Sequence, residues 1–272
     1  LRSVEFSSLA DVQRWSGLAG DGLFDTLLVF QNFPVEAALA DLETRLGLAD
    51  ADARTVLGDA MSTAMPKAAK KGVSIEVTDA DRELMAAHFP DFIAMNYYTS
   101  VTVEYPEDAS NMADGISDQQ SEDIMDAGFY KGFTNPNLEK TQFAWTIDPE
   151  GMLTTLLAIE DRYAMPIVIT ENGLGAYDEL TPEGTIEDDY RIDYYRRHIE
   201  QIHLAVSDGV DVFGYCPWAA IDLISTHQGC SKRYGFIYVN REEFDLLDLA
   251  RIKKDSFGWY QKVIAGNGVD LA

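Results

Sequence analysis

Apolar runs and amphipathic stretches alternate along the chain from about residue 73 onward. Three short apolar runs predict strands, at 91–98, 166–170 and 211–218, and each leads into polar or aromatic residues. Runs without polar alternation are typical of parallel strands that are buried on both faces. The repeated change from such a run to a helical pattern predicts an α/β fold with a parallel sheet.

Helical periodicity predicts three helices in the same region. One helix, at about 189–207, has an apolar face made of Ile192, Tyr195, Ile199, Ile202 and Val206. Another begins near Asp148, which can cap it, and has Pro149 in the first turn, where a missing N–H is tolerated. The last runs from about Ser256 to Gly266, because glycine commonly ends helices.

Two other segments differ from this pattern. Residues 1–75 include an Ala- and Leu-rich stretch with apolar positions at helical spacing, which predicts a mainly helical segment. Residues 101–130 contain eight acidic residues and no Lys or Arg, which predicts a surface loop rather than a packed element. We therefore expect two units, a helical one at 1–75 and an α/β one at 76–272.

Composition predicts a packed core and excludes some classes of partner. The 272 residues are 46% hydrophobic and 11% aromatic, which is enough for a large domain. The net charge of -25 argues against nucleic acid and against an anionic membrane surface, because both attract basic proteins. No apolar run is long enough to span a membrane and no signal peptide is evident, so we expect a soluble, cytoplasmic protein.

Metal and disulfide chemistry are not indicated. The two cysteines, Cys216 and Cys230, lack metal-ligand spacing, and so few thiols favour a reducing compartment. No pair of the four histidines has a metal-ligand spacing that a motif supports. We expect neither a metal nor a cofactor.

Candidate chemistry lies where the predicted strands end. Glu171 directly follows the apolar run 166–170, and a (β/α) barrel places its catalytic groups at the carboxyl ends of its strands. From position alone, a glutamate that ends a strand and meets solvent is an equally good interpretation. The run at 91–98 ends with Asn96 and Tyr98, which offer an amide and a phenol.

Several motifs, taken together and in order, resemble a known family. The motifs 96-NYY-98 and 169-ITENG-173, and the stretch from Trp218 through Tyr238, resemble the retaining β-glycosidases of glycoside hydrolase family one, and above all its 6-phospho-β-glucosidases. The resemblance covers about residues 78–268. It implies a partial (β/α)8 TIM barrel and the hydrolysis of a small phosphorylated β-glucoside.

The resemblance also implies roles for individual residues. Glu171 matches the nucleophile, which attacks the anomeric carbon and forms a covalent glycosyl-enzyme. Tyr98 matches the phenol that hydrogen-bonds this carboxylate, and Asn96 matches a polar residue beside it. Trp218 matches the aromatic floor under the sugar, although a lone tryptophan is more often core packing.

A phosphate site is implied on the loop at 225–234. Plain β-glucosidases of the family have a glutamate seven residues after this tryptophan, whereas this chain has Ser225. A carboxylate would repel a 6-phosphate, but a hydroxyl can donate to it, and Lys232 and Tyr234 match the other phosphate-binding residues. The alternative is a solvated basic turn that also contains Arg233.

The chain departs from the family in its first half. The family places its acid/base in an Asn-Glu-Pro motif, which occurs nowhere in this sequence. A complete barrel needs about 250 residues, so we expect only its last three strands or so. Residues 13–39 weakly resemble a nonribosomal peptide synthetase condensation domain without its catalytic motif, which suggests a composite chain.

Three hypotheses follow from this departure. The first is a 6-phospho-β-glucosidase that lacks leaving-group protonation, which typically contributes about 10²–10⁴ in rate. The second is a non-catalytic half barrel that binds phosphosugar without cleaving it. The third is a partner-binding module built on residues 1–75 and the acidic segment at 101–130. In each case the open edge of the half barrel predicts self-association.

Overall fold

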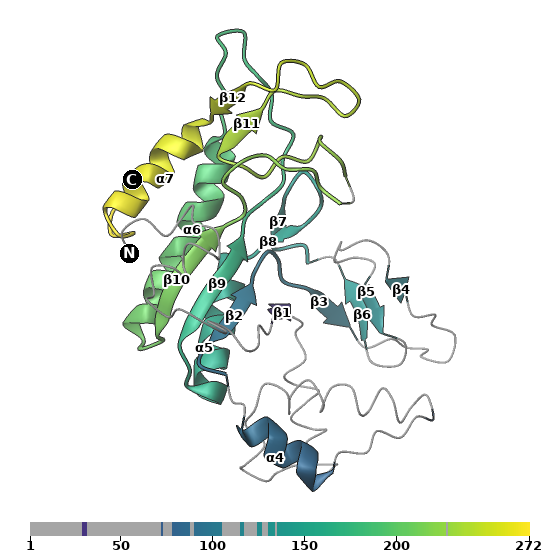
Figure 1. Ribbon diagram of the computed structural model, residues 1–272, viewed down its shortest axis with the longest axis vertical. Helices are drawn as coiled ribbons and strands as arrows, with labels where there is room; N and C mark the ends of the chain where they lie inside the picture. The colour runs from purple at the N-terminus through teal and green to yellow at the C-terminus, as the bar shows by residue number, and fades with distance from the viewer. Residues whose placement is uncertain are drawn as a thin grey trace, which may run out of the picture.

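A parallel sheet forms the centre of the protein (Figure 1). The computed structural model describes residues 29–31, 72, 78–87, 90–104, 115–116, 124–126, 130–133, 135–226 and 228–272. The sheet has the order β1-β2-β9-β10, and all neighbours are parallel. Its strands are β1 (Val29–Gln31), β2 (Ile93–Asn96), β9 (Ile167–Asn172) and β10 (Val212–Pro217). The three predicted strands are thus confirmed, and they are neighbours.

Two helices separate β2, β9 and β10 along the chain and a third follows β10, as the periodicity predicted. They are α5 (Pro149–Tyr163), α6 (Asp189–Ser207) and α7 (Asp255–Ala265), and they lie along one side of the sheet (Figure 1). The Oδ1 atom of Asp148 accepts a hydrogen bond from the Gly151 N–H at 3.0 Å, which confirms the predicted cap. Because strand and helix alternate and the strands are parallel, the fold is part of a (β/α)8 barrel.

Two apolar clusters fix the helices against the sheet. The first fills the space between the sheet, α5 and the end of α6, and includes Met95, Met152, Leu156, Ile167 and Ile169. The second joins α6 and α7 to the segment after β9, and includes Leu174, Tyr195, Phe236 and Trp259. Burial of such side chains stabilises the fold by about 1.5–3 kcal/mol each. The carboxyl ends of β2, β9 and β10 are therefore held at fixed positions.

The buried face of α6 differs from the predicted one. Val206 is 49% exposed, whereas Arg191, Tyr194 and His198 are buried. Hydrophobic periodicity missed these three because each is polar, and each is buried with hydrogen-bond partners that lie far away in the sequence or in the helix backbone. Tyr195, Ile199 and Ile202 are buried as predicted, so the observed face is the predicted one extended by these polar residues.

His198 should make stability depend on pH. Its Nδ1 donates to the Tyr194 carbonyl at 2.7 Å, while no described residue bonds to its buried Nε2. Burial lowers the pKa of His198 from 6.5 to about 4, so the unfolded chain binds a proton at higher pH than the folded chain does. Neutral His198 therefore contributes about 3 kcal/mol to the free energy of unfolding above pH 6.5, and this contribution is lost as the pH falls toward 4. Urea unfolding at pH 4.5 and 7 should show a smaller pH difference for His198→Gln than for the wild type.

The control for this prediction lies on the same helix. His203 is exposed on α6, so His203→Gln should leave the pH dependence as it is in the wild type. An unchanged pH dependence in His198→Gln would show that carboxylates alone produce the slope.

The expectation of a surface loop at 101–130 is wrong. A second sheet of order β3-β6-β5-β4 forms there, and all of its pairs are antiparallel. Its strands are β3 (Thr102–Glu104), β4 (Gly115–Ile116), β5 (Ile124–Asp126) and β6 (Tyr130–Phe133). Antiparallel strands of two to four residues need no continuous apolar run and tolerate charge on a solvated face, so composition did not predict them.

Shorter elements complete the described structure. They are α4 (Asp79–Ala87), the antiparallel pair β7 (Glu139–Lys140) and β8 (Thr146–Ile147), and the antiparallel pair β11 (Ile237–Val239) and β12 (Arg251–Lys253). Within residues 1–75, β1 belongs to the segment 13–39 and pairs with β2. The helices predicted for residues 1–75 lie outside the described residues. None of the helices that can be described is long and apolar enough to cross a membrane.

Candidate active site

Glu171 and Tyr98 form the centre of the candidate site. Glu171 lies near the carboxyl end of β9, and the Tyr98 hydroxyl, just beyond β2, donates to its Oε2 at 2.5 Å. The Tyr97 N–H also donates to the Glu171 carbonyl at 2.9 Å, so backbone and side chain are both fixed to the neighbouring strand. The carboxylate thus has a phenol partner, and the role of Glu171 as nucleophile stays a prediction.

Tyr98 remains a hydrogen-bond donor over the whole physiological pH range. Burial, and then the adjacent Glu171 carboxylate, raise the pKa of Tyr98 far above its usual value of 10. A phenol that stays protonated can only orient the carboxylate and does not exchange a proton with it near neutral pH. The pair is suited to holding an anionic oxygen in one direction.

Asn96 lies beside this pair, as predicted. Residue 96 pairs with Glu171 in the parallel register of β2 and β9. Its Oδ1 accepts from the Thr170 hydroxyl at 2.6 Å, and this hydroxyl also lies 3.0 Å from the Met95 carbonyl. The amide orientation of Asn96 is thereby set, with its nitrogen free of the Thr170 contact.

Asn172 is a buried hub that the sequence analysis did not single out. Its Nδ2 donates to the Tyr97 carbonyl at 2.7 Å and to the Tyr194 hydroxyl at 3.1 Å, while its Oδ1 accepts from the Tyr215 hydroxyl at 2.7 Å. Tyr194 in turn donates to the Tyr98 carbonyl at 3.2 Å. The available signal in the sequence was an asparagine directly after the candidate carboxylate. Its three partners lie on different parts of the chain, so the sequence did not reveal the hydrogen bonds.

Trp218 follows β10 and is tied to the same hub. Its N–H donates to the Asn172 carbonyl at 2.7 Å, its carbonyl accepts from the Tyr195 hydroxyl at 3.2 Å, and the Trp218–Ala219 peptide bond is cis. The side chain is half-buried rather than part of either core cluster. Its predicted role as an aromatic floor for the sugar stays a prediction.

The structure brings Ser225, Lys232 and Tyr234 together. The Tyr234 hydroxyl donates to Ser225 Oγ at 3.3 Å, and the Lys232 ammonium lies 5.5 Å from the centre of the Tyr234 ring. Burial raises the pKa of Tyr234, so this phenol also remains a donor. These three residues, and Arg233 with them, are at most 7% exposed. The alternative of a solvated basic turn is therefore wrong.

A network of buried ion pairs holds the loop 225–234 against the rest of the fold. Arg233 Nη1 contacts Asp222 at 3.1 Å, and the Lys254 ammonium contacts both Asp222, at 2.7 Å, and Asp178. Arg191 binds Asp178 at 2.9 Å and Asp188 at 2.8 Å. Because all the charges are paired, their burial is tolerated and the loop is held rigidly. Composition could not reveal these pairs.

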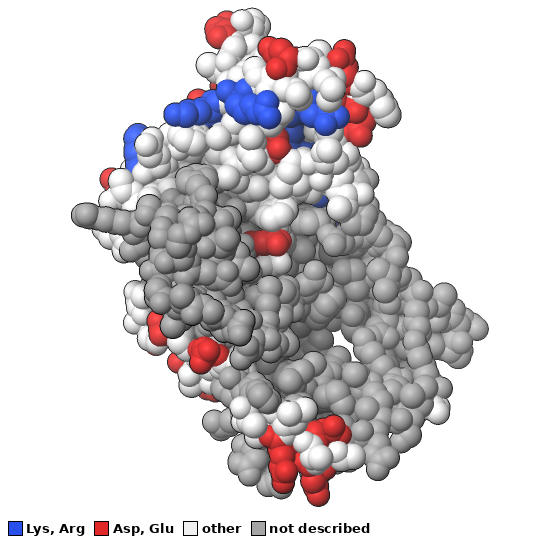
Figure 2. Space-filling model, viewed as in Figure 1, with Lys and Arg blue, Asp and Glu red and all other residues white. Residues whose placement is uncertain are grey.

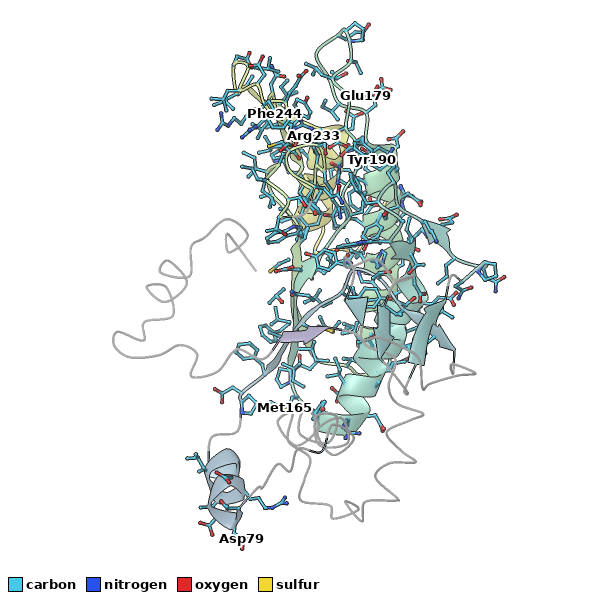
Figure 3. The ribbon with its side chains drawn as sticks, turned by 90° about the vertical axis from the view of Figure 1, so that its right-hand side faces the viewer. Asp79, Met165, Glu179, Tyr190, Arg233 and Phe244 are labelled. Atoms are coloured by element: carbon cyan, nitrogen blue, oxygen red, sulfur yellow. The ribbon has the colours of Figure 1, made fainter. Side chains whose placement is uncertain are left out.

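Figure 2 shows where positive charge gathers on this acidic protein. Lys and Arg side chains form a band at the level of β11 and β12. Figure 3 places Arg233 at this end of the molecule, opposite Met165 at the amino end of β9. On this face, most of the visible positive charge thus lies at the end of the sheet that carries the candidate site. Across the part of the chain that the structure describes, no three His, Cys, Asp or Glu residues could hold a metal ion.

The barrel fold and the carboxylate at its strand end define the class: a (β/α)8-barrel protein with its candidate site at the carboxyl ends of the strands. Within this class, the chain belongs to glycosyl hydrolase family 1, whose model matches residues 35–269. The match begins before residue 75, and the boundary between 1–75 and 76–272 stays a prediction.

Similar proteins of the family include enzymes for phosphorylated glucosides. The chain is 44% identical over 211 residues to the aryl-phospho-beta-D-glucosidase BglC of Bacillus subtilis, covering 74% of this chain and 43% of that protein. It is 40% identical over 203 residues to the 6-phospho-beta-glucosidase AscB of Escherichia coli, covering 74% and 40%. The chain therefore spans less than half the length of these relatives.

Solved structures give the same family. A beta-glucosidase from Thermotoga maritima in complex with glucoimidazole is similar with a TM-score of 0.59 and 30% identity. The match covers 73% of this chain and 40% of that one.

Proposed function

We propose that this chain carries the nucleophile and the phosphate-binding residues of a retaining glycosidase for 6-phospho-β-glucosides. The observation that carries the proposal is the Tyr98–Glu171 hydrogen bond of 2.5 Å at the strand ends of a family 1 barrel. The burial of Ser225, Lys232 and Tyr234 around one point supports the phosphorylated substrate, as do the names of the relatives.

The proposed chemistry begins with attack of a Glu171 oxygen on the anomeric carbon. A C–O bond forms there while the glycosidic C–O bond breaks, and its electron pair leaves with the aglycone oxygen. Water then attacks the anomeric carbon: a new C–O bond forms, the bond to Glu171 breaks with its electron pair returning to the carboxylate, and the proton of the water passes to solvent. The sugar leaves with its original anomeric configuration. Tyr98 orients Glu171 for the first step.

The chain alone should act on substrates with good leaving groups. The sequence has no Asn-Glu-Pro motif, so no assigned acid protonates the departing oxygen. A dinitrophenolate or a fluoride leaves without such help, whereas an alkoxide does not. With a glycoside of an ordinary alcohol, the chain would bind the substrate but not cleave it. The missing motif therefore favours a second candidate function, a half barrel that binds phosphosugar.

Loss of Lys232 should weaken phosphosugar binding. Hydrogen bonds to a charged group contribute about 1.5–3 kcal/mol, so Lys232→Met should weaken glucose 6-phosphate binding by about 10- to 100-fold. Ser225→Glu should abolish it, because a carboxylate repels the phosphate. Isothermal titration calorimetry measures both effects.

A matched control comes from a lysine elsewhere on the chain. Lys253 is exposed on β12, so Lys253→Met makes the same change of charge and should leave binding unchanged. Equal weakening by the two substitutions, or equal affinity of the wild type for glucose and glucose 6-phosphate, would refute the phosphate site.

We further propose that β10 mediates contact with a second copy of the chain. No described strand pairs with the outer edge of β10, no residue of β10 is fully buried, and Phe213 is 45% exposed. Parallel strands are normally buried on both faces, so this edge favours self-association.

Light scattering after gel filtration tests this proposal. The wild type should elute as a dimer or larger, and Phe213→Lys should shift it toward monomer. Val206→Lys, at a similarly exposed apolar residue on α6, should not. A wild type that stays monomeric at high concentration would contradict the proposal. We also propose a cytoplasmic location, because a charged phosphosugar does not cross a bilayer unaided.

A further inference from the structure

Trp145 contacts both parts of the candidate site, the Tyr98–Glu171 pair through Tyr98 and the Ser225, Lys232 and Tyr234 cluster through Lys232. It belongs to the hairpin formed by β7 and β8, which lies beside the ends of β2 and β9 in Figure 1. Thr141 closes this hairpin: its carbonyl accepts from the Ala144 N–H at 2.9 Å, and its hydroxyl accepts from the Trp145 N–H at 3.2 Å. The backbone at Trp145 is therefore held in place by hydrogen bonds to Thr141.

The Trp145 ring contacts Tyr98, the hydrogen-bond partner of the proposed nucleophile Glu171. The rings of Trp145 and Tyr98 meet edge to face, with centroids 5.4 Å apart. The hydroxyl of Thr146, the next residue, donates to the Ser100 carbonyl at 2.7 Å and lies 2.5 Å from the Thr99 hydroxyl. The hairpin is thus attached to the segment that carries Tyr98.

The other contact is with the proposed phosphate-binding lysine. The Lys232 ammonium lies 4.1 Å from the Trp145 ring centroid and 4.8 Å from that of Phe143. The stem of Lys232 crosses Gly175, where an added Cβ would overlap it. Lys232 is only 5% exposed, so much of the hydration of its ammonium is lost. A cation in such a place is stabilised by the negative face of an aromatic ring.

We propose that Trp145 is a specificity-determining residue for phosphorylated sugars: its indole holds the Lys232 ammonium charged and in position for the 6-phosphate. A lysine that is already oriented loses less side-chain entropy when the phosphate binds. Because the same indole contacts Tyr98, it also links phosphate recognition to the orientation of Glu171. The inference rests on the proposed role of Lys232 in phosphate binding.

A double-mutant cycle on glucose 6-phosphate affinity tests the inference. Trp145→Leu should weaken binding by about tenfold, the loss expected for one desolvated cation–π contact. In the Lys232→Met background the same substitution should change affinity by less than about twofold, because the contact is already gone. Trp145→Phe should show an intermediate loss and serves if the leucine variant does not fold. Calorimetry gives the affinities, and circular dichroism confirms folding.

The outcomes separate this inference from the proposed function. Equal losses from Trp145→Leu with and without Lys232 would overturn the inference, because the tryptophan would then act on general packing. An unchanged affinity in Lys232→Met would overturn the phosphate site itself. Phe257→Leu removes a cation–π contact of 4.5 Å with Lys253, away from the site, and should leave affinity unchanged.

Discussion

Replacing Glu171 with glutamine is expected to abolish formation of the covalent glycosyl-enzyme. The substitution keeps the shape of the side chain and an oxygen for the Tyr98 hydrogen bond, but removes the nucleophilic carboxylate. Loss of the covalent nucleophile in a serine protease costs about 10⁶-fold in kcat, and we expect a loss of similar order here. A 2,4-dinitrophenyl β-glucoside 6-phosphate is the suitable substrate, because its leaving group needs no acid. Release of dinitrophenolate and intact-mass detection of the adduct measure the effect.

The control is a glutamate that faces solvent in the segment after β9. Glu179 is exposed eight residues after Glu171, so Glu179→Gln should react as the wild type does. Adduct formation that persists in Glu171→Gln would show that another carboxylate is the nucleophile. A folded wild type that forms no adduct and still binds glucose 6-phosphate would favour the phosphosugar-binding half barrel.

The parallel core of the fold could be predicted from the sequence because its signals are local. The apolar runs that became β2, β9 and β10 are each a few residues long, and Asp148 and Pro149 mark a helix start by their own chemistry. The antiparallel sheet at 102–133 could not be predicted, because each strand is stabilised by a partner elsewhere in the segment. Pairing of this kind leaves no period in the sequence.

The candidate site divides in the same way. Glu171, Tyr98 and the 225–234 loop were found through motifs, and the structure places them at one end of the sheet. Asn172 lies in the motif 169-ITENG-173 and Trp145 lies within the range of the resemblance. Their contacts nevertheless join residues up to 87 positions apart, as between Trp145 and Lys232. A cation–π contact or an amide hub is a tertiary feature, so only the folded chain reveals which residues support the chemistry.

Arg191 should be the most important charged residue for stability. It is fully buried on α6, pairs with Asp178 and Asp188, and donates to the carbonyls of Leu174 and Tyr234. Arg191→Met removes the cation and leaves two buried carboxylates with fewer partners. Breaking one member of a buried ion pair lowers the free energy of unfolding by about 3–5 kcal/mol. Urea unfolding followed by circular dichroism measures the change.

The same helix offers the matched control, since Arg197 pairs with Glu139 at 2.7 Å on the surface, where their side chains are 35% and 70% exposed. Arg197→Met should therefore lower the free energy of unfolding by no more than about 1 kcal/mol. Similar losses in the two variants would contradict a structural role for the buried network. Because Arg191 contacts both the segment after Glu171 and the loop that carries Tyr234, its loss should also weaken glucose 6-phosphate binding at temperatures where the variant remains folded. Stability and phosphate recognition would then both depend on one guanidinium, which binds Asp178, Asp188 and the carbonyls of Leu174 and Tyr234.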